Sequence, residues 1–139
     1  MLSLLSLLSL LSGPALAGVT VQVDALEVDG LAVKTLHCEL QSGGLFASAM
    51  VVGTLSHHKT DLDACAPAGG AVQATWTWSQ GKASGVEVPR GSPESAAACV
   101  SKVLTSMDAE LSGSCKAVVL LGEREAAEKA AAALAVQAE

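Results

Sequence analysis

The chain has 139 residues, of which 14 are acidic and 8 basic, so its formal net charge is −6 at pH 7. This acidic balance argues against nucleic acid or an anionic membrane surface as a partner, because both call for clustered Lys and Arg. The only aromatic residues are two Trp and one Phe, so the core has to come from Val, Leu and Ala, and a small core of that kind gains from covalent links.

The amino terminus is predicted to be a cleavable signal peptide over residues 1–17. An apolar run over residues 2–11 is followed by Gly13 and Pro14, which end a helix, and by Ala15-Leu16-Ala17, a small-residue site that suits signal peptidase. A membrane anchor is the alternative, but a span needs about 20 apolar residues and this run ends sooner. No Lys or Arg precedes the run. We therefore expect export to the periplasm or extracellular space, with no stable membrane span after cleavage.

Residues 19–40 are predicted to form a β-hairpin. The residues Val19, Val21 and Val23 alternate with polar residues, as in a strand with one buried face. Asp29-Gly30 is a strong signal for a two-residue turn, and the pairing that follows sets Val21 opposite Cys38. The apolar parity changes around residues 24–26, which a bulge or strong twist would allow. The apolar hairpin tip is either exposed or covered by another element, and we expect cover because exposed patches are rarer.

Helical spacing follows over residues 45–65, after a loop at residues 41–44. Val51, Val52, Leu55 and Leu62 fall near one face of this predicted helix. The segment Thr60-Asp61-Leu62-Asp63 resembles a capping box, so a break or restart near residue 60 is expected.

Residues 71–89 show a second hairpin pattern. Val72, Ala74, Trp76 and Trp78 share one strand face, residues 80–82 form a turn, and a return strand runs to Pro89. The two Trp side chains could form a platform for a peptide or a glycan. We expect them in the core instead, because other large side chains are scarce.

The carboxy-terminal third predicts a helix, a strand and a tail. Ser92-Pro93-Glu94 is expected to open a helix over residues 93–107, with Ser as N-cap. Its apolar stripe is Ala96, Cys99, Val100, Val103, Leu104 and Met107. Alternating apolar residues over 115–121 predict a final strand, which completes a single domain over residues 18–122. Residues 123–139 are rich in Ala and have little apolar surface, so we expect a frayed helical tail.

Four cysteines, Cys38, Cys65, Cys99 and Cys115, form an even set in a chain expected to be exported. Two structural disulfides are favoured, and three pairings are possible. No spacing resembles CxxC, so neither a structural zinc site nor a thioredoxin-like redox pair is expected.

Residues 62–122 resemble the TonB carboxy-terminal domain, and most closely its cysteine-bearing AgmX/PglI-type relatives from motility-associated and other envelope proteins. The matching points are Leu62-Asp63-Ala64-Cys65, the strand at 71–78, the turn at Gly81, the strand at 86–88 and Ala98-Cys99-Val100. The resemblance implies that Cys65 pairs with Cys99, which leaves Cys38 to pair with Cys115 and to join the first hairpin to the last strand.

The sequence also departs from that family. Residues 107–110, Met-Asp-Ala-Glu, stand where the family usually has an aromatic-Pro motif, and residues 18–61 lie outside the resemblance. The Pro-rich spacer and membrane anchor of TonB itself have no counterpart here, so energy transduction does not carry over.

Residues with metal-ligand chemistry cluster once, at His57, His58, Asp61 and Asp63. Neighbouring His residues point in different directions on a helix and no HExxH pattern is present, so we favour a solvated helix end over a metal site. The sequence has no GxSxG elbow, GxGxxG loop or P-loop, and paired cysteines are not free thiolates. We expect no catalytic residue and no cofactor.

Together these patterns predict an α+β domain: a small antiparallel sheet with two packed helices, TonB C-terminal-like and joined by two disulfides. The expected function is a non-enzymatic module that binds an envelope or secreted protein through a sheet edge, at Ser84, Val86 and Val88. The alternatives are a small metal-binding protein or metal-dependent enzyme at the His–Asp cluster, and a purely structural secreted domain.

Overall fold

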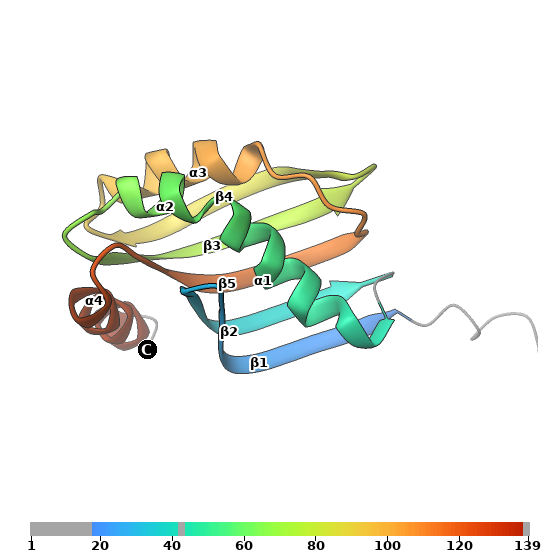
Figure 1. The fold of residues 1–139 in the computed structure, drawn as a ribbon, viewed down its shortest axis with the longest axis horizontal. Helices are drawn as coiled ribbons and strands as arrows, with labels where there is room; N and C mark the ends of the chain where they lie inside the picture. The colour runs from blue at the N-terminus through green and yellow to red at the C-terminus, as the bar shows by residue number, and fades with distance from the viewer. Residues whose placement is uncertain (1–17, 42–43, 138–139) are drawn as a thin grey trace, which may run out of the picture.

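The computed structural model describes residues 18–41 and 44–137 (Figure 1), and the predicted signal peptide lies outside these residues. In chain order the elements are β1 (Val19–Val28), β2 (Leu31–Leu40), the 3-10 helix η2 (Gly44–Phe46), α1 (Ala47–His57), α2 (Lys59–Ala64), β3 (Gly70–Ser79), β4 (Lys82–Ser92), α3 (Ala96–Thr105), β5 (Gly113–Leu121) and α4 (Arg124–Gln137). The predicted α+β class, with an antiparallel sheet, packed helices and two disulfides, is confirmed.

The five strands form one antiparallel sheet in the order β1-β2-β5-β3-β4. The last strand of the chain, β5, is therefore the central one, and β1 and β4 are the two edges. Helices α1, α2 and α3 lie along one face of the sheet, and α4 lies against the opposite face near one end (Figure 1).

The first hairpin has the predicted register, with Val21 opposite Cys38 and Val28 opposite Leu31. The predicted change of face is also present. Thr35 on β2 has a φ of 49°, and the pairing of β2 with β5 shifts by one residue between Lys34 and His37. This bulge turns the tip of the hairpin so that Leu31 and Val33 face the same helices as the rest of the strand. The tip is therefore covered, as expected.

Trp76 and Trp78 on β3 are the largest side chains of the core, exposed by only 2% and 1%. Their rings meet edge to face, with centroids 6.2 Å apart and planes at 88°. This arrangement confirms the prediction that they pack as core, and it leaves neither ring available as a binding platform.

Two helix starts differ from the predictions. The break between α1 and α2 falls at His58, close to the expected position, but no side chain caps α2 and the predicted capping box is not formed. Helix α3 begins at Ala96 with Ser95 as its N-cap residue, because the pairing of β4 with β3 continues as far as Ser92. Ser92 is thus the end of a strand, and the prediction of Ser92 as an N-cap was wrong.

Helix α4 is docked on the sheet, contrary to the expectation of a frayed tail. Its buried residues Ala127, Ala131 and Leu134 pack on a second apolar cluster formed by strand residues Ala32, Ala71 and Leu120. These three strand residues stand between the positions of the main core, so they face away from α1, α2 and α3. Small Ala side chains let the helix approach closely, and this compensates for its narrow apolar face.

Candidate functional site

The two disulfides are nested in the sequence: the outer one joins two neighbouring strands, and the inner one joins two helices. Cys38 and Cys115 lie directly opposite each other on β2 and β5, with their Cα atoms 4.1 Å apart. Cys65, at the end of α2, joins Cys99 on α3 with a Cα separation of 5.6 Å. These are the pairs that the resemblance implied, and no described cysteine is free. Paired cysteines of this kind are typical of an oxidising compartment.

The two disulfides differ in exposure. Cys38 and Cys115 are 0% and 4% exposed and belong to the main core. Cys99 is exposed and Cys65 is half-buried. The prediction that Cys99 lies on the buried stripe of its helix was therefore wrong, because the buried face of α3 is formed by Ala96, Val100 and Leu104 and Cys99 lies beside it.

The His–Asp cluster is spread over the junction of α1 and α2. His57 and Asp61 are exposed, and Asp63 binds elsewhere: its carboxylate pairs with Lys59 and accepts a hydrogen bond of 2.9 Å from the main-chain N–H of Gly122. Over the described ranges, no three His, Cys, Asp or Glu side chains are gathered as a metal ion would require. The metal hypothesis stays untested in solution, where metal analysis of the purified protein would decide it.

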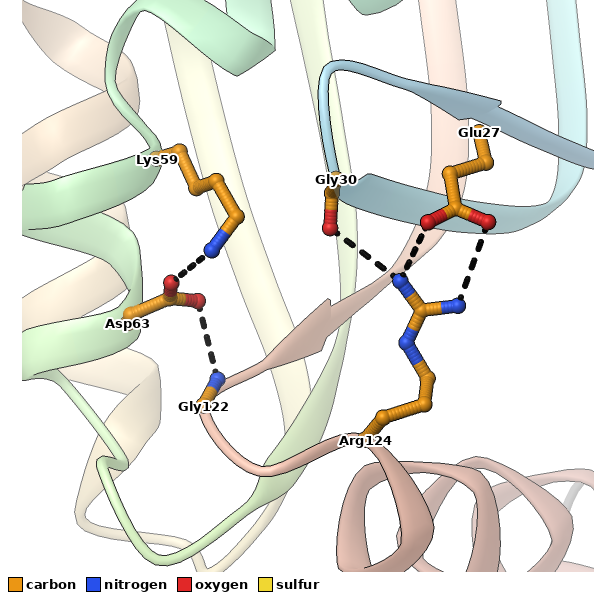
Figure 2. Close-up of polar contacts among 6 residues, drawn as sticks. All are labelled: Glu27, Gly30, Lys59, Asp63, Gly122 and Arg124. Atoms are coloured by element: carbon orange, nitrogen blue, oxygen red, sulfur yellow. Dashed lines mark hydrogen bonds and ion pairs between the residues drawn. The ribbon is translucent and has the colours of Figure 1, made fainter.

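Polar contacts gather instead at the end of the sheet next to the hairpin tip, where Figure 2 shows two neighbouring groups. Arg124, the first residue of α4, donates to the carboxylate of Glu27 at 2.8 and 3.4 Å and to the carbonyl of Gly30 at 3.1 Å. The neighbouring group is Asp63 with Lys59 and Gly122. These contacts join the hairpin tip, α2, the end of β5 and α4, so we interpret them as a structural clamp.

The electrostatics of the clamp follow from its hydrogen bonds. The side-chain hydrogen bond from Arg124, reinforced by its charge, lowers the pKa of Glu27 below its ordinary value, and the same bond raises the pKa of Arg124. The pKa of Glu123 is also lowered, because its carboxylate accepts the main-chain N–H groups of Ala126 and Glu125 at the start of α4. Glu123 therefore caps α4 and favours its helical start.

The predicted binding segment lies on β4, which is an edge strand. Ser84 is exposed, while Val86 and Val88 are half-buried and pack against the main core. The pairing of β4 with β3 shifts register twice, Gly85 has a φ of 57°, and Pro89 lacks a main-chain donor. Bulges and proline are features that prevent an edge from accepting another strand.

The opposite edge, β1, lacks these features. It pairs with β2 in a single register from Val19 to Val28, and it contains neither Gly nor Pro. A shallow groove of about 420 Å³ runs along it, lined by Val19–Val23 and by Gly44, Ala47 and Ser48 at the start of α1. Sequence reasoning missed this edge, because the sheet order depends on the pairing of β2 with β5, where the paired residues Cys38 and Cys115 are 77 positions apart in the chain.

The direction of the free main-chain groups on β1 follows from the buried disulfide. A Cα separation of 4.1 Å places Cys38 and Cys115 in a narrow, non-hydrogen-bonded pair. The N–H and C=O of Cys38 therefore face β1, where the opposite residue is Val21. By the alternation of an antiparallel ladder, the N–H and C=O groups of Thr20 and Gln22 point outward from the sheet.

The sheet face that carries α4 has two further hollows. One, of about 400 Å³, follows α4 between Val118 and Leu134, with Lys34 paired to Glu128 at its rim. The other, of about 370 Å³, lies on the open part of the sheet and includes His37 and Glu39, whose Nε2 and Oε1 atoms are 3.6 Å apart. Neither hollow brings a nucleophile and a base together in a contact that the structure shows.

Comparison with known proteins found no match: no family model, no curated protein and no solved structure is significantly similar to this chain. The resemblance to TonB carboxy-terminal domains therefore stays a prediction. Within the described part of the chain, no helix is sufficiently long and apolar to cross a membrane.

Proposed function

We propose that this chain is an exported, non-enzymatic protein-interaction module that binds an extended segment of another polypeptide at an open edge of its sheet. The observation that carries the proposal is the first half of β1: residues 19–23 lie in one regular register, without Gly or Pro, on the outer edge of the sheet. An incoming strand gains main-chain hydrogen bonds at such an edge, and alternate side chains supply specificity.

The two edges of the sheet are not equivalent for this purpose. On β4, Val86 and Val88 pack against the main core and the pairing with β3 shifts register twice, so an added strand would lose its register. On β1 the outward N–H and C=O groups at Thr20 and Gln22 lie within a regular stretch next to a groove. The proposal therefore places the binding edge at β1, and Ser84, Val86 and Val88 stay as the second choice.

Export and the absence of catalysis are part of the same proposal. Two disulfides close the fold, as in proteins of oxidising compartments, and residues 1–17 carry the pattern of a signal peptide. The resemblance of residues 62–122 to TonB carboxy-terminal domains points the same way, since open sheets of that kind offer an edge to a partner strand.

Site-specific photo-cross-linking in the producing cells tests the proposal. A photo-reactive residue is placed at Thr20 on β1, at Ser84 on β4, or at Lys129 on α4, whose side chain is 79% exposed and serves as the control. We expect a discrete cross-linked product from Thr20 and none from Lys129. A product from Ser84 alone would move the site to β4, and no product from either edge would refute the proposal.

A further inference from the structure

We infer that the segment bound at β1 is a second copy of the same strand, so that two molecules join through their first strands into one continuous ten-stranded sheet. This inference rests on the proposed function and names its partner. The exposed edge at residues 19–23 reads Val-Thr-Val-Gln-Val, which is a palindrome in polarity. An antiparallel copy of the segment therefore presents the same pattern that the edge itself presents.

A twofold axis through Val21 pairs the outward main-chain N–H and C=O groups of the two copies. It sets Thr20 opposite Gln22 of the other copy and Gln22 opposite Thr20 of the other copy, and these are the residues whose N–H and C=O groups point outward. Each such pair exchanges two hydrogen bonds, which gives about four for the symmetric interface. Val21 meets its own equivalent in the narrow pair between them, where side chains approach most closely.

The same axis brings apolar side chains of one copy against apolar side chains of the other. On the helix-covered face, Val19 and Val23 of one copy meet Val23 and Val19 of the other, so the valine row of the core continues across the interface. The groove of about 420 Å³ between β1 and the first turn of α1 lies on this path. Phe46, just before α1, and Met50, in α1, are 73% and 36% exposed. Few large apolar side chains of the described chain are so exposed.

Charge favours a second copy over a basic or acidic partner. An edge that recognised a basic segment would carry carboxylates along it, but residues 19–23 contain no charged side chain. The first carboxylate, Asp24, falls opposite Gly18 of the other copy, so the two acidic groups do not face each other. Like charges directly opposite would destabilise a cross-strand pairing, and this register avoids them.

Sedimentation equilibrium of the secreted, disulfide-intact protein tests the inference. Wild type is expected to be a dimer. Gln22→Pro removes one outward N–H from each copy without disturbing the β1–β2 ladder, since proline is tolerated where an edge N–H faces solvent. We expect it to weaken dimerisation by roughly tenfold to a hundredfold, for two lost hydrogen bonds. Gln22→Ala is the matched control: it keeps the main-chain donor and should remain dimeric.

Circular dichroism and disulfide mapping confirm that each variant is folded. A monomeric wild type, or a Gln22→Pro variant as dimeric as Gln22→Ala, would overturn the inference. The two proposals fail differently, because mass spectrometry identifies the product cross-linked from Thr20. A peptide of this chain supports self-pairing. A peptide of another protein refutes self-pairing and keeps the interaction module, and no product refutes both.

Discussion

The two disulfides should contribute unequally to stability, and their burial decides the order. The perturbations are the double variants Cys65→Ala/Cys99→Ala and Cys38→Ala/Cys115→Ala. For chain separations of 34 and 77 residues, loop-closure entropy assigns about 3.8 and about 4.5 kcal/mol of stabilisation at 25 °C. This difference of roughly 0.7 kcal/mol is too small to separate the two bonds.

The burial of the sulfur atoms separates them. Truncating Cys38 and Cys115 also empties two positions that are 0% and 4% exposed, which adds about 1 kcal/mol for each side chain. Cys99 is exposed, so its truncation leaves no comparable cavity. We therefore expect losses of about 4 kcal/mol for the exposed bond and about 6.5 kcal/mol for the buried one.

Urea unfolding under non-reducing conditions measures both losses, with the fluorescence of the buried Trp76 and Trp78 as the signal. If the second variant does not fold at all, timed reduction of wild type by a dithiol, followed by alkylation and peptide mapping, gives the same comparison. The Cys65–Cys99 bond should open first because a thiolate can reach Cys99. An equal or larger loss for the exposed bond, or earlier opening of the buried one, would refute this reasoning.

Three further outcomes are expected. Gly122→Ala should lower the free energy of unfolding by more than about 2 kcal/mol, because a Cβ there would lie 2.0 Å from the carbonyl oxygen of Ala66. Gly81 also has a positive φ but open space around it, so Gly81→Ala should lower it by only about 1 kcal/mol. Urea unfolding measures both losses. Trp78→Phe should lower the free energy of unfolding by under about 1.5 kcal/mol, because the buried indole N–H that it removes has no acceptor in the described chain. Trp78→Ala should lower it by about 3–5 kcal/mol, because it leaves a cavity. Equal losses for the two variants would contradict this. The pKa values of Glu27 and Glu123 are lower in the folded protein than in the unfolded chain. Their carboxylates therefore stabilise the docking of α4 fully above the ordinary carboxyl pKa. This stabilisation is lost as the pH falls through the pKa of the folded protein. Hydrogen exchange of α4 should therefore rise relative to β5 on acidification, and unchanged protection of α4 would contradict the clamp.

Local sequence patterns predicted the individual strands and helices well, but they did not predict which strands lie next to one another in the sheet. Alternation and the Asp29-Gly30 turn predicted the first hairpin and its register, because both depend on residues close in the chain. The central place of β5 could not be read in the same way, since it depends on pairings with β2 and β3 that span long separations. The prediction of the binding edge at residues 84–88 was made without the sheet order, so it could not compare that edge with β1.

Helix α4 was underestimated for a related reason. Its buried face consists mainly of Ala127 and Ala131, which carry little apolar surface, so the helix alone predicts a frayed tail. The missing signal was on the strands: Ala32 and Leu120 are apolar at positions that alternation assigns to the far face. The salt bridge of Glu27 and Arg124 joins residues 97 apart, and no sequence pattern indicates it.

The central position of β5 has a consequence for how the protein matures. A chain that enters an oxidising compartment from its amino terminus exposes Cys38 and then Cys65 before either correct partner has arrived. Cys38 has to wait for a strand 77 residues further on, and that strand also has to insert between two hairpins that are already present. Cys38 and Cys65 are not partners, so any bond that forms between them early has to be rearranged by thiol–disulfide exchange before the native pairs can form.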